Sequence, residues 1–305
     1  MHIADKTRVV HSAHMKPFGI TGVITALLVP AFHARAEVPQ PVPTIGDEYE
    51  ISWSSESSSQ TSDGSSSQSH NRDTVLERVI GGREFGLELE YDLPKDAKAE
   101  DRARIWQFPV RVLRPSNGPM QLLNRHELEL RLESWLKAAG WTRDVCGRWF
   151  FTWNAFRIDC DPQSVIKAIE ALDFRSANLR EGALYQVADA RGPGTLTKET
   201  TEPNATRFAV VMEIDPATIH RTRAESDVAI GEIMQKAVTL DAATRERKKE
   251  SVSGTISVTF DIDSAGNVRR RTKITKLEIK RPDGVSESKI VTETVERHLS
   301  SSADQ

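Results

Sequence analysis

The clearest chemistry that residue types and spacing indicate in this sequence is a disulfide bond between its two cysteines, Cys146 and Cys160. Thirteen residues separate the two thiols, whereas thiol redox sites and paired metal ligands favour a CxxC spacing. A low, even cysteine count is typical of a structural disulfide in an oxidising compartment. We therefore predict this bond, which closes a loop of about 15 residues and stabilises the fold by about 3 kcal/mol in the chain-entropy description.

A cluster of aromatic residues runs from Trp135 to Phe156 and contains four of the six tryptophans. Tryptophan gives a large contact area at low conformational cost, so the cluster is a candidate recognition surface for an apolar ligand, a glycan or a protein partner. The alternative is a small core around the disulfide, which is favoured because Phe150 would lie on the opposite strand face from its neighbours. The residues of the candidate surface are Trp141, Trp149, Phe151 and Trp153.

Other reactive residues are scattered, and we predict no catalytic, cofactor-binding or metal-binding residues. No two histidines have metal-ligand spacing, and there is no G-x-S-x-G nucleophile motif. Asp261 and Asp263, followed by Gly266, resemble the start of a calcium loop, but the twelfth position is not a glutamate, so a hairpin turn explains them better. The histidines beyond residue 36 are His70, His126, His220 and His298.

The first part of the chain has the features of a cleavable signal peptide. Lys16 is followed by an apolar stretch over residues 18–29, and Pro30 ends that stretch. About 12 apolar residues are too few to cross a bilayer, which needs about 20. We therefore expect no membrane anchor in the mature protein.

The predicted cleavage lies between Ala36 and Glu37, after the small-x-small pattern that begins at Ala34. Met15 is an alternative start of the precursor, because the residues before it do not resemble the beginning of a signal peptide. No cysteine lies directly after the apolar stretch to carry a lipid, since the first one in the chain is Cys146. The mature chain is predicted to be periplasmic or secreted.

The charge balance argues against nucleic acid as a partner. The full chain has a net charge of −3, and a mildly acidic protein is a poor match for phosphate backbones. Basic runs at 245–249 and 269–271 are short and flanked by acidic residues, so we interpret them as solvated faces.

Alternation with a period of two predicts strands at both ends of the chain. Tyr49, Ile51 and Trp53 alternate with polar residues, and a serine-rich stretch centred on Asp63-Gly64 predicts a long hairpin. A disordered or glycosylated linker is the alternative for this stretch. A third strand is predicted after a break at Gly81-Gly82. Further strands are predicted at 255–262, 268–280 and 285–297.

Helical spacing appears in the middle of the chain. Asn124 resembles the start of a capping box with Glu127, ahead of a helix to Ala139. Asp161-Pro162 and Asp215-Pro216 are typical helix starts, because proline fits the first turn.

The predicted fold is α+β, with a curved antiparallel sheet built from N- and C-terminal meanders and packed against central helices with one disulfide. Two separate domains are the alternative. The predicted divisions are a signal peptide (1–36), an extended proline-rich arm (37–46), an N-terminal β meander (47–115), a helical disulfide-stapled insert (116–200), a C-terminal α/β meander that completes the sheet (201–300) and a frayed tail (301–305).

Two resemblances accompany these patterns. The segments RDTVLERVIGGREFGLELEYDLP and GRWFFTWNAFRIDCDPQSVI resemble exported proteobacterial envelope proteins without assigned function, and that resemblance implies no activity. GTISVTFDIDSAGNV, from Gly254 to Val268, is similar to a β-hairpin in the C-terminal domain of TonB-type energy-transducing proteins. It covers about fifteen residues, and here another hairpin follows where that family has a helix.

Together these patterns predict an exported, soluble, non-enzymatic envelope protein that needs no cofactor. Its expected role is to bind or carry an apolar ligand or a protein partner in the concavity of the sheet. One alternative is a hydrolase whose site is assembled from distant residues. The other is a structural or assembly protein that uses the exposed edge of the serine-rich hairpin.

Overall fold

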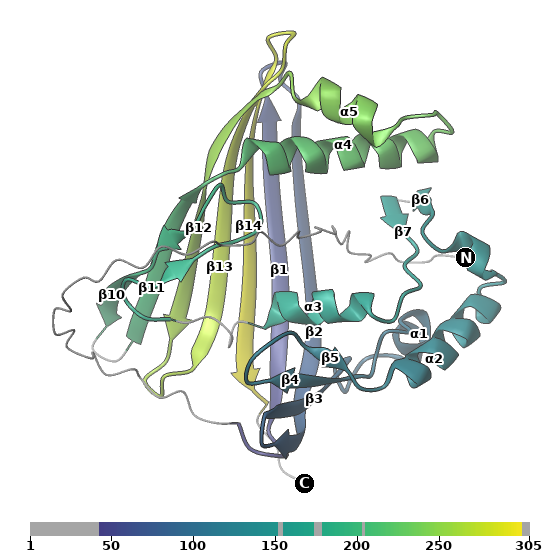
Figure 1. Ribbon diagram of the computed structural model, residues 1–305, viewed down its shortest axis with the longest axis vertical. Helices are drawn as coiled ribbons and strands as arrows, with labels where there is room; N and C mark the ends of the chain where they lie inside the picture. The colour runs from purple at the N-terminus through teal and green to yellow at the C-terminus, as the bar shows by residue number, and fades with distance from the viewer. Residues whose placement is uncertain (1–42, 152–154, 174–178, 203–204, 301–305) are drawn as a thin grey trace, which may run out of the picture.

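The computed structural model describes residues 43–151, 155–173, 179–202 and 205–300. Antiparallel strands are the main secondary structure of this chain, and helices lie on one side of them (Figure 1). Ten strands form one sheet: β1 (Glu48–Thr61), β2 (Ser66–Arg83), β3 (Gly86–Asp92), β4 (Val110–Pro115), β5 (Gln121–Leu122), β10 (Thr197–Glu202), β11 (Ala205–Glu213), β12 (Ser251–Ile262), β13 (Val268–Lys280) and β14 (Ser286–Leu299). From one edge to the other, the order is β10, β11, β12, β13, β14, β1, β2, β3, β4 and β5.

The remaining elements are helices and two small hairpins that connect or cover the strands of the large sheet. The helices are α1 (Ala99–Arg104), α2 (Arg125–Ala138), α3 (Ser164–Leu172), α4 (Pro216–Ile233) and α5 (Leu240–Arg247), with a 3₁₀ turn at Arg143–Val145. The small hairpins pair β6 (Trp149–Phe151) with β7 (Ala155–Arg157), and β8 (Leu184–Tyr185) with β9 (Gly194–Thr195).

The two ends of the chain meet in the middle of the large sheet. Strand β14 pairs with β1 in antiparallel register, from Tyr49 opposite Leu299 to Thr61 opposite Glu287. The N-terminal and C-terminal strands therefore form one continuous hydrogen-bonded sheet.

The alternation along each strand separates two faces of this sheet. We call the face that carries the helices the inner face. It includes Ile51 and Val75, which pair across β1 and β2 and are only 2% and 8% exposed. The opposite or outer face carries Ser54, Glu56 and other polar side chains of the same strands. One face therefore supplies the core, as the period-two pattern requires.

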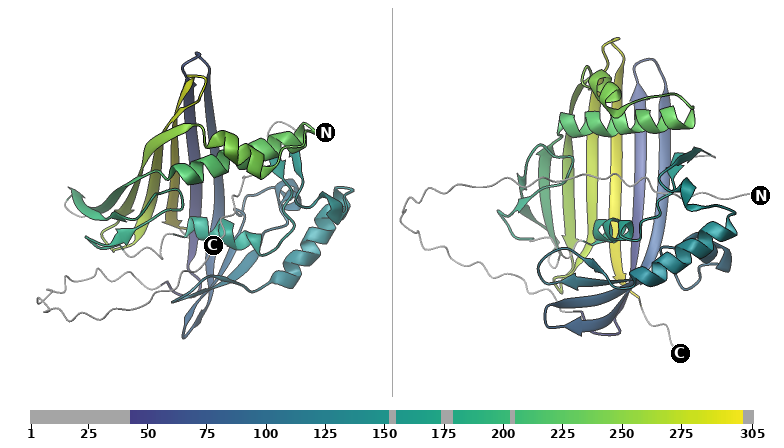
Figure 2. Two further views of the ribbon diagram at one scale, coloured as in Figure 1. Left: turned by 45° about the horizontal axis from the view of Figure 1, so that its top comes forward. Right: turned by 45° about the vertical axis from the view of Figure 1, so that its right-hand side comes forward.

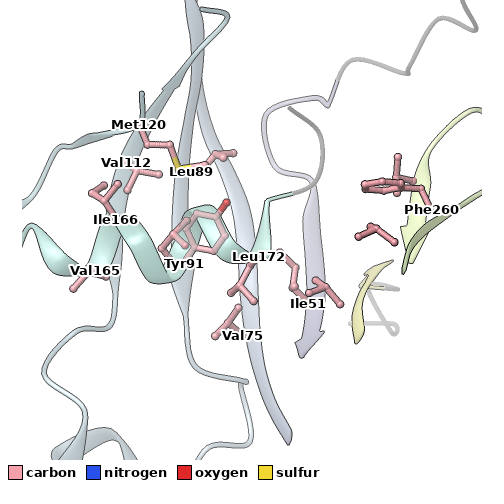
Figure 3. Packing of buried hydrophobic residues seen from close by; sticks show 14 of the residues in the cluster. Ile51, Val75, Leu89, Tyr91, Val112, Met120, Val165, Ile166, Leu172 and Phe260 are labelled. Carbon is pink, nitrogen blue, oxygen red and sulfur yellow. The ribbon is translucent and has the colours of Figure 1, made fainter. Parts of the chain in front are cut away.

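Helix α3 packs on the inner face at one end of the sheet. Its apolar side chains recur every three or four residues, so they form one buried stripe. Figure 3 shows this stripe beside side chains of β2, β3 and β4. The buried residues of α3 are Val165, Ile166, Ile169 and Leu172.

Helices α4 and α5 lie across the other end of the inner face (Figures 1 and 2). Asp215 accepts a hydrogen bond from the backbone N–H of Ala217 and precedes Pro216, so the predicted start of α4 is confirmed. Helix α5 was not predicted, and its last three residues fall in the basic run at 245–249 that was interpreted as a solvated face. Its Arg247 instead pairs with Asp227 of α4 and with Glu250.

The turn between β1 and β2 forms at the predicted Asp63-Gly64 pair. The Gly64 N–H donates to the Thr61 carbonyl oxygen at 3.0 Å, and the Thr61 N–H donates to the Ser65 carbonyl at 2.9 Å. Gly64 has a φ of +93°, which glycine adopts without steric cost. The serine-rich stretch is thus a regular hairpin, and the linker alternative is wrong.

The predicted strand break at Gly81-Gly82 is wrong. Strand β2 continues through it to Arg83, with a shift of register against β3 between Val79 and Gly81. A Cβ atom at Gly81 would lie 3.1 Å from the Glu88 carboxylate. These glycines therefore mark a β-bulge, where the lack of a side chain allows close packing.

The start of α2 is held differently from the predicted capping box. Asn124 makes no cap hydrogen bond with its side chain. Its Oδ1 atom accepts a hydrogen bond from the Arg111 N–H at 2.9 Å, and its Nδ2 atom donates to the Pro109 carbonyl at 3.2 Å. Asn124 therefore ties the helix to β4.

No helix in the described ranges is both long enough and apolar enough to span a membrane.

Candidate functional site

The aromatic cluster separates into a packed stack and a more exposed strand face. Trp141 lies edge-on to Trp135 at 5.6 Å between ring centroids and stacks on Phe150 at 5.9 Å. Phe150 in turn stacks on Phe156 at 5.8 Å, and the two residues pair across β6 and β7. Trp141 therefore belongs to a small core beside the disulfide.

Trp149 and Phe151 lie on the other face of β6, because side chains alternate along a strand. Phe151 is 63% exposed, whereas Trp149 is half-buried. The backbone N–H of Trp149 donates to Glu232 of α4 at 3.1 Å, so the hairpin is attached to that helix. Trp153 lies outside the described residues.

The predicted disulfide is present at the base of this hairpin. Cys146 and Cys160 are bonded, with their Cα atoms 5.5 Å apart. Next to the bond, the Gly147 N–H donates to the Ile158 carbonyl at 2.7 Å. The predicted cleavage point between Ala36 and Glu37 lies outside the described residues.

Between α3 and α4, the inner face carries a band of polar and apolar side chains. We call this band the inner strip. Its side chains point to the same side as the apolar core, yet they are half-buried rather than buried. The residues of the inner strip are Trp53, Ser55, Ser57, Lys273, Val291 and Glu293.

Lys273 carries the positive charge of the inner strip. Its Nζ atom lies 3.2 Å from Asp189 and 3.2 Å from Glu293. Burial alone would lower the pKa of Lys273, but the carboxylates of Glu293 and Asp189 outweigh it and raise that pKa above its usual value. The lysine therefore stays protonated and compensated, and it is unsuited to act as a nucleophile.

Two further residues border this charged group. Arg271 donates to the carbonyl oxygen of Ala171 near the end of α3 at 2.6 Å. Tyr185 packs edge-on against Phe260 with ring centroids 5.3 Å apart. Burial raises the pKa of Tyr185, and the cations of Arg271 and Lys273 offset this only in part, so the phenol is neutral near pH 7.

The outer face holds two adjoining hollows with volumes of about 630 and 370 Å³. Both are lined mainly by polar residues of β1, β2, β13 and β14. They share Glu56 and His70, which lie 3.4 Å apart. The other lining residues are Ser52, Ser54, Ser57, Ser58, Gln68, Ser69, Arg72, Arg270, Thr272, Ile290, Thr292, Thr294 and Glu296.

The histidines occupy four separate places in the described chain. His220 contacts the backbone carbonyl oxygen of Glu250 at 3.1 Å, whereas the Glu250 carboxylate is held by Arg223 and Arg247. This network joins α4 and α5 to the end of β12. Within the described ranges, no three His, Cys, Asp or Glu side chains are placed to hold a metal ion.

Asp263 serves the hairpin turn between β12 and β13. It accepts hydrogen bonds from the N–H groups of Ala265 at 3.0 Å and Asn267 at 2.9 Å. Burial alone would raise the pKa of Asp263, but the hydrogen bonds from Asn267 and the charge of Arg269 outweigh it and lower that pKa. The turn interpretation of this calcium-like sequence is therefore confirmed.

A buried charged group links strands from both ends of the chain. Glu77 is 1% exposed and accepts hydrogen bonds from Tyr91 at 2.7 Å and from Arg297 at 2.8 Å. The Arg297 guanidinium also lies 3.3 Å from the centre of the Tyr49 ring. This group holds β14, β1, β2 and β3 together and is structural.

Sequence reasoning missed the inner strip as well as Glu77. Arg271 lies within the basic run at 269–271 that was interpreted as solvated, and Lys273 follows that run after Thr272. The pattern that could have revealed them is the alternation along the strand, which places both side chains on the same side as Phe260 and Val258 of β12. Asp189 had no local signal, because it reaches Lys273 from a connection 84 residues away.

The fold and these sites define a class: a large antiparallel sheet with helices on one face and a disulfide-closed aromatic hairpin. No protein-family model matches the sequence, and no curated protein is significantly similar to it. Among solved structures, the chain is similar to one titled for lipid–protein interactions in lipovitellin, with 9% identity and a TM-score of 0.40. That alignment covers 86% of this chain and 26% of the lipovitellin chain.

The chain is also similar to Ail, the attachment invasion locus protein of Yersinia pestis. The identity is 4% and the TM-score 0.19, over 84% of this chain and 100% of that one. No conclusion about fold or function follows from values this low.

Proposed function

We propose that this protein is an exported, non-enzymatic binding protein of the cell envelope, periplasmic or secreted. Its α+β fold presents the inner side of a curved sheet to its ligand. The ligand is a mainly apolar molecule or partner segment with a polar group, and it binds along the inner strip. The observation that carries the proposal is the half-buried, mixed character of this strip between two helices.

The two helices are anchored at separate levels of the sheet. Arg271 ties the inner face to the end of α3, and Arg223 of α4 pairs with Glu287 of β14 at 3.2 Å. Between these anchors, Ser55 and Val291 are half-buried although their neighbours at the α3 level are buried. A surface of this kind combines apolar contact with a few oriented polar groups, as ligand sites do.

The chemistry of the strip selects the ligand class. Val291 and Trp53 offer apolar contact, whereas Ser55 and Glu293 offer a hydroxyl and a carboxylate. Lys273 is already compensated by two carboxylates, but a fully apolar ligand would displace water from the Ser55 hydroxyl and the Glu293 carboxylate without replacing its hydrogen bonds. We therefore favour a ligand that carries hydroxyl, amide or zwitterionic groups beside its apolar part.

The Cys146–Cys160 bond supports the export part of the proposal. Structural disulfides persist in oxidising compartments such as the periplasm and the extracellular space. The predicted signal peptide leads to the same compartment.

A hydrolase remains the competing proposal. It would need a histidine held by a carboxylate beside a nucleophile. His220 is held instead through the carbonyl oxygen of Glu250, whose carboxylate binds two arginines. This arrangement favours binding over catalysis at that position.

The test is native mass spectrometry of the mature protein purified from the envelope, with two adjacent substitutions on β14. Val291→Lys places a charge on the inner strip, whereas Ile290→Lys places the same charge on the outer face. We expect the wild type and I290K to carry a co-purifying ligand or a cross-linked partner. V291K should retain it at least about tenfold less, because an unpaired charge is costly to bury.

Two results would contradict the proposal. One is a wild-type protein with neither a co-purifying ligand nor a cross-linked partner. The other is equal retention by both lysine variants, which would move the binding site away from the inner strip.

A further inference from the structure

Among the described strands, β3 pairs with only about half of β2. Strand β3 pairs with β2 only from Leu76 to Arg83, whereas β1 pairs with it from Ser66 to Arg78. In Figure 1, this free half of β2 extends beyond β3 toward the end of the sheet that carries α4. We call the segment Ser66–Asn71 the open edge; no strand of the described ranges pairs with it on the side away from β1.

The open edge lacks the features that usually protect sheet edges. Ser66–Asn71 contains no Lys, Arg, Asp, Glu or Pro, and its register with β1 is regular. By contrast, β5 at one border of the sheet has two residues. At the other border, β10 contains Lys198 and Glu199 and has a register shift.

The turn geometry shows which backbone groups point outward. The Thr61 N–H bonds to the Ser65 carbonyl, and hydrogen-bonded pairs then recur at every second residue of an antiparallel ladder. Ser67, Ser69 and Asn71 therefore bond to β1. The N–H and C=O groups of Gln68 and His70 point away from the sheet.

We propose that the open edge pairs with the open edge of a second copy of this chain, in antiparallel orientation about a two-fold axis near Ser69. Gln68 of each copy then lies opposite His70 of the other and exchanges two backbone hydrogen bonds with it. The pairing extends the ten-stranded sheet across two protomers.

Symmetry and charge favour a second copy as the occupant. A two-fold axis makes an antiparallel edge complementary to itself, because each outward donor meets an outward acceptor. The side chains brought together are Ser67 with Asn71 and Ser69 with its own copy, so no like formal charges oppose each other. These small side chains also allow close approach on the inner face.

If the predicted cleavage occurs, residues 37–42 are too short to occupy this edge. Residues 37–42 span about 20 Å when extended, and their prolines lack the N–H that a strand needs. The chain enters β1 at Glu48, and Ser58, which faces Gln68, lies ten residues further along. That distance is about 34 Å at strand geometry.

Sedimentation velocity of the mature protein over a range of concentrations tests the proposal. We expect the wild type to sediment as a dimer whose fraction rises with concentration. Gln68→Pro removes one outward N–H per copy at an edge position that tolerates proline, so it should raise the dimer dissociation constant at least about tenfold. The matched control Gln68→Ser keeps the N–H and should dimerise like the wild type.

Hydrogen exchange of the wild type tests the same contact without a substitution. The amides of Gln68 and His70 should become more protected as the concentration rises, whereas the amide of Asn71 is already bonded to β1 and should change little. Three results would each overturn the proposal. The wild type could stay monomeric, or the Q68P variant could fold and dimerise like Q68S. The third is that the hydrogen-exchange protection of the Gln68 and His70 amides does not depend on concentration. The ligand test at Val291 is read in separate samples, so either proposal can fail alone.

Discussion

At the scale of single residues, the charged side chains of this protein divide by their partners. Glu77 and Arg297 are both buried and hold each other across strands from opposite ends of the chain. Lys273 is compensated by two carboxylates on the inner strip. No sequence pattern predicted these ion pairs, because a single strand does not reveal which partner crosses from another strand.

Glu77→Ala tests the buried group. Arg297 would then remain buried without this carboxylate, so the free energy of unfolding should fall by about 3–5 kcal/mol. Urea unfolding followed by circular dichroism measures the loss, and Glu50→Ala on the exposed side of β1 is the control. A loss of less than about 1 kcal/mol would mean that the pair adds little to stability.

Asp63 gives a test by pH. Hydrogen bonds from the Thr61 hydroxyl and from Ser65 lower the pKa of Asp63 from 3.8 to about 2. Because the folded-state pKa is lowered, the contribution of Asp63 to stability is present above pH 3.8 and disappears as the pH falls through about 2.

Nuclear magnetic resonance titration of the Asp63 carboxyl should show this low pKa. Thr61→Val removes the hydroxyl donor and should move the pKa back toward its usual value. An unchanged titration in T61V would rule out the hydroxyl as the main cause.

At the scale of elements, local sequence patterns predicted the long strands β1, β2, β12, β13 and β14 and failed where side chains act at a distance. The Asp63-Gly64 turn and the Asp215-Pro216 helix start depend on neighbouring residues, so the sequence reveals them. The Gly81-Gly82 bulge depends on Glu88 in the next strand. Helix α5 depends on Arg247 reaching α4, so its basic residues were misread.

The disulfide-closed hairpin gives a test at this scale. Replacing both Cys146 and Cys160 with serine should lower the free energy of unfolding by about 3 kcal/mol. The near-ultraviolet circular dichroism of the stacked Trp141 should weaken, whereas the far-ultraviolet signal of the large sheet should persist, since β6 and β7 are not part of it. Loss of the sheet signal would show that the hairpin is needed for the whole fold.

At the scale of the whole molecule, the pairing of β14 with β1 decides the architecture. It places the first and last described strands side by side and creates an inner face wide enough for α3 and α4 to attach at separate levels. The same topology leaves β3 alongside only one half of β2. The inner strip and the open edge both follow from this arrangement, and so do the proposals on ligand binding and self-pairing.

The sequence by itself determined the antiparallel strands, their main turns, the helix at Asp215-Pro216 and the Cys146–Cys160 bond, because these depend on spacing along the chain. Only the tertiary structure decided that Lys273 meets Asp189, that Trp141 is packed while Phe151 is exposed, and which edge of β2 is open. Such contacts join residues far apart in sequence, and their positions depend on the pairing of whole strands rather than on any local pattern.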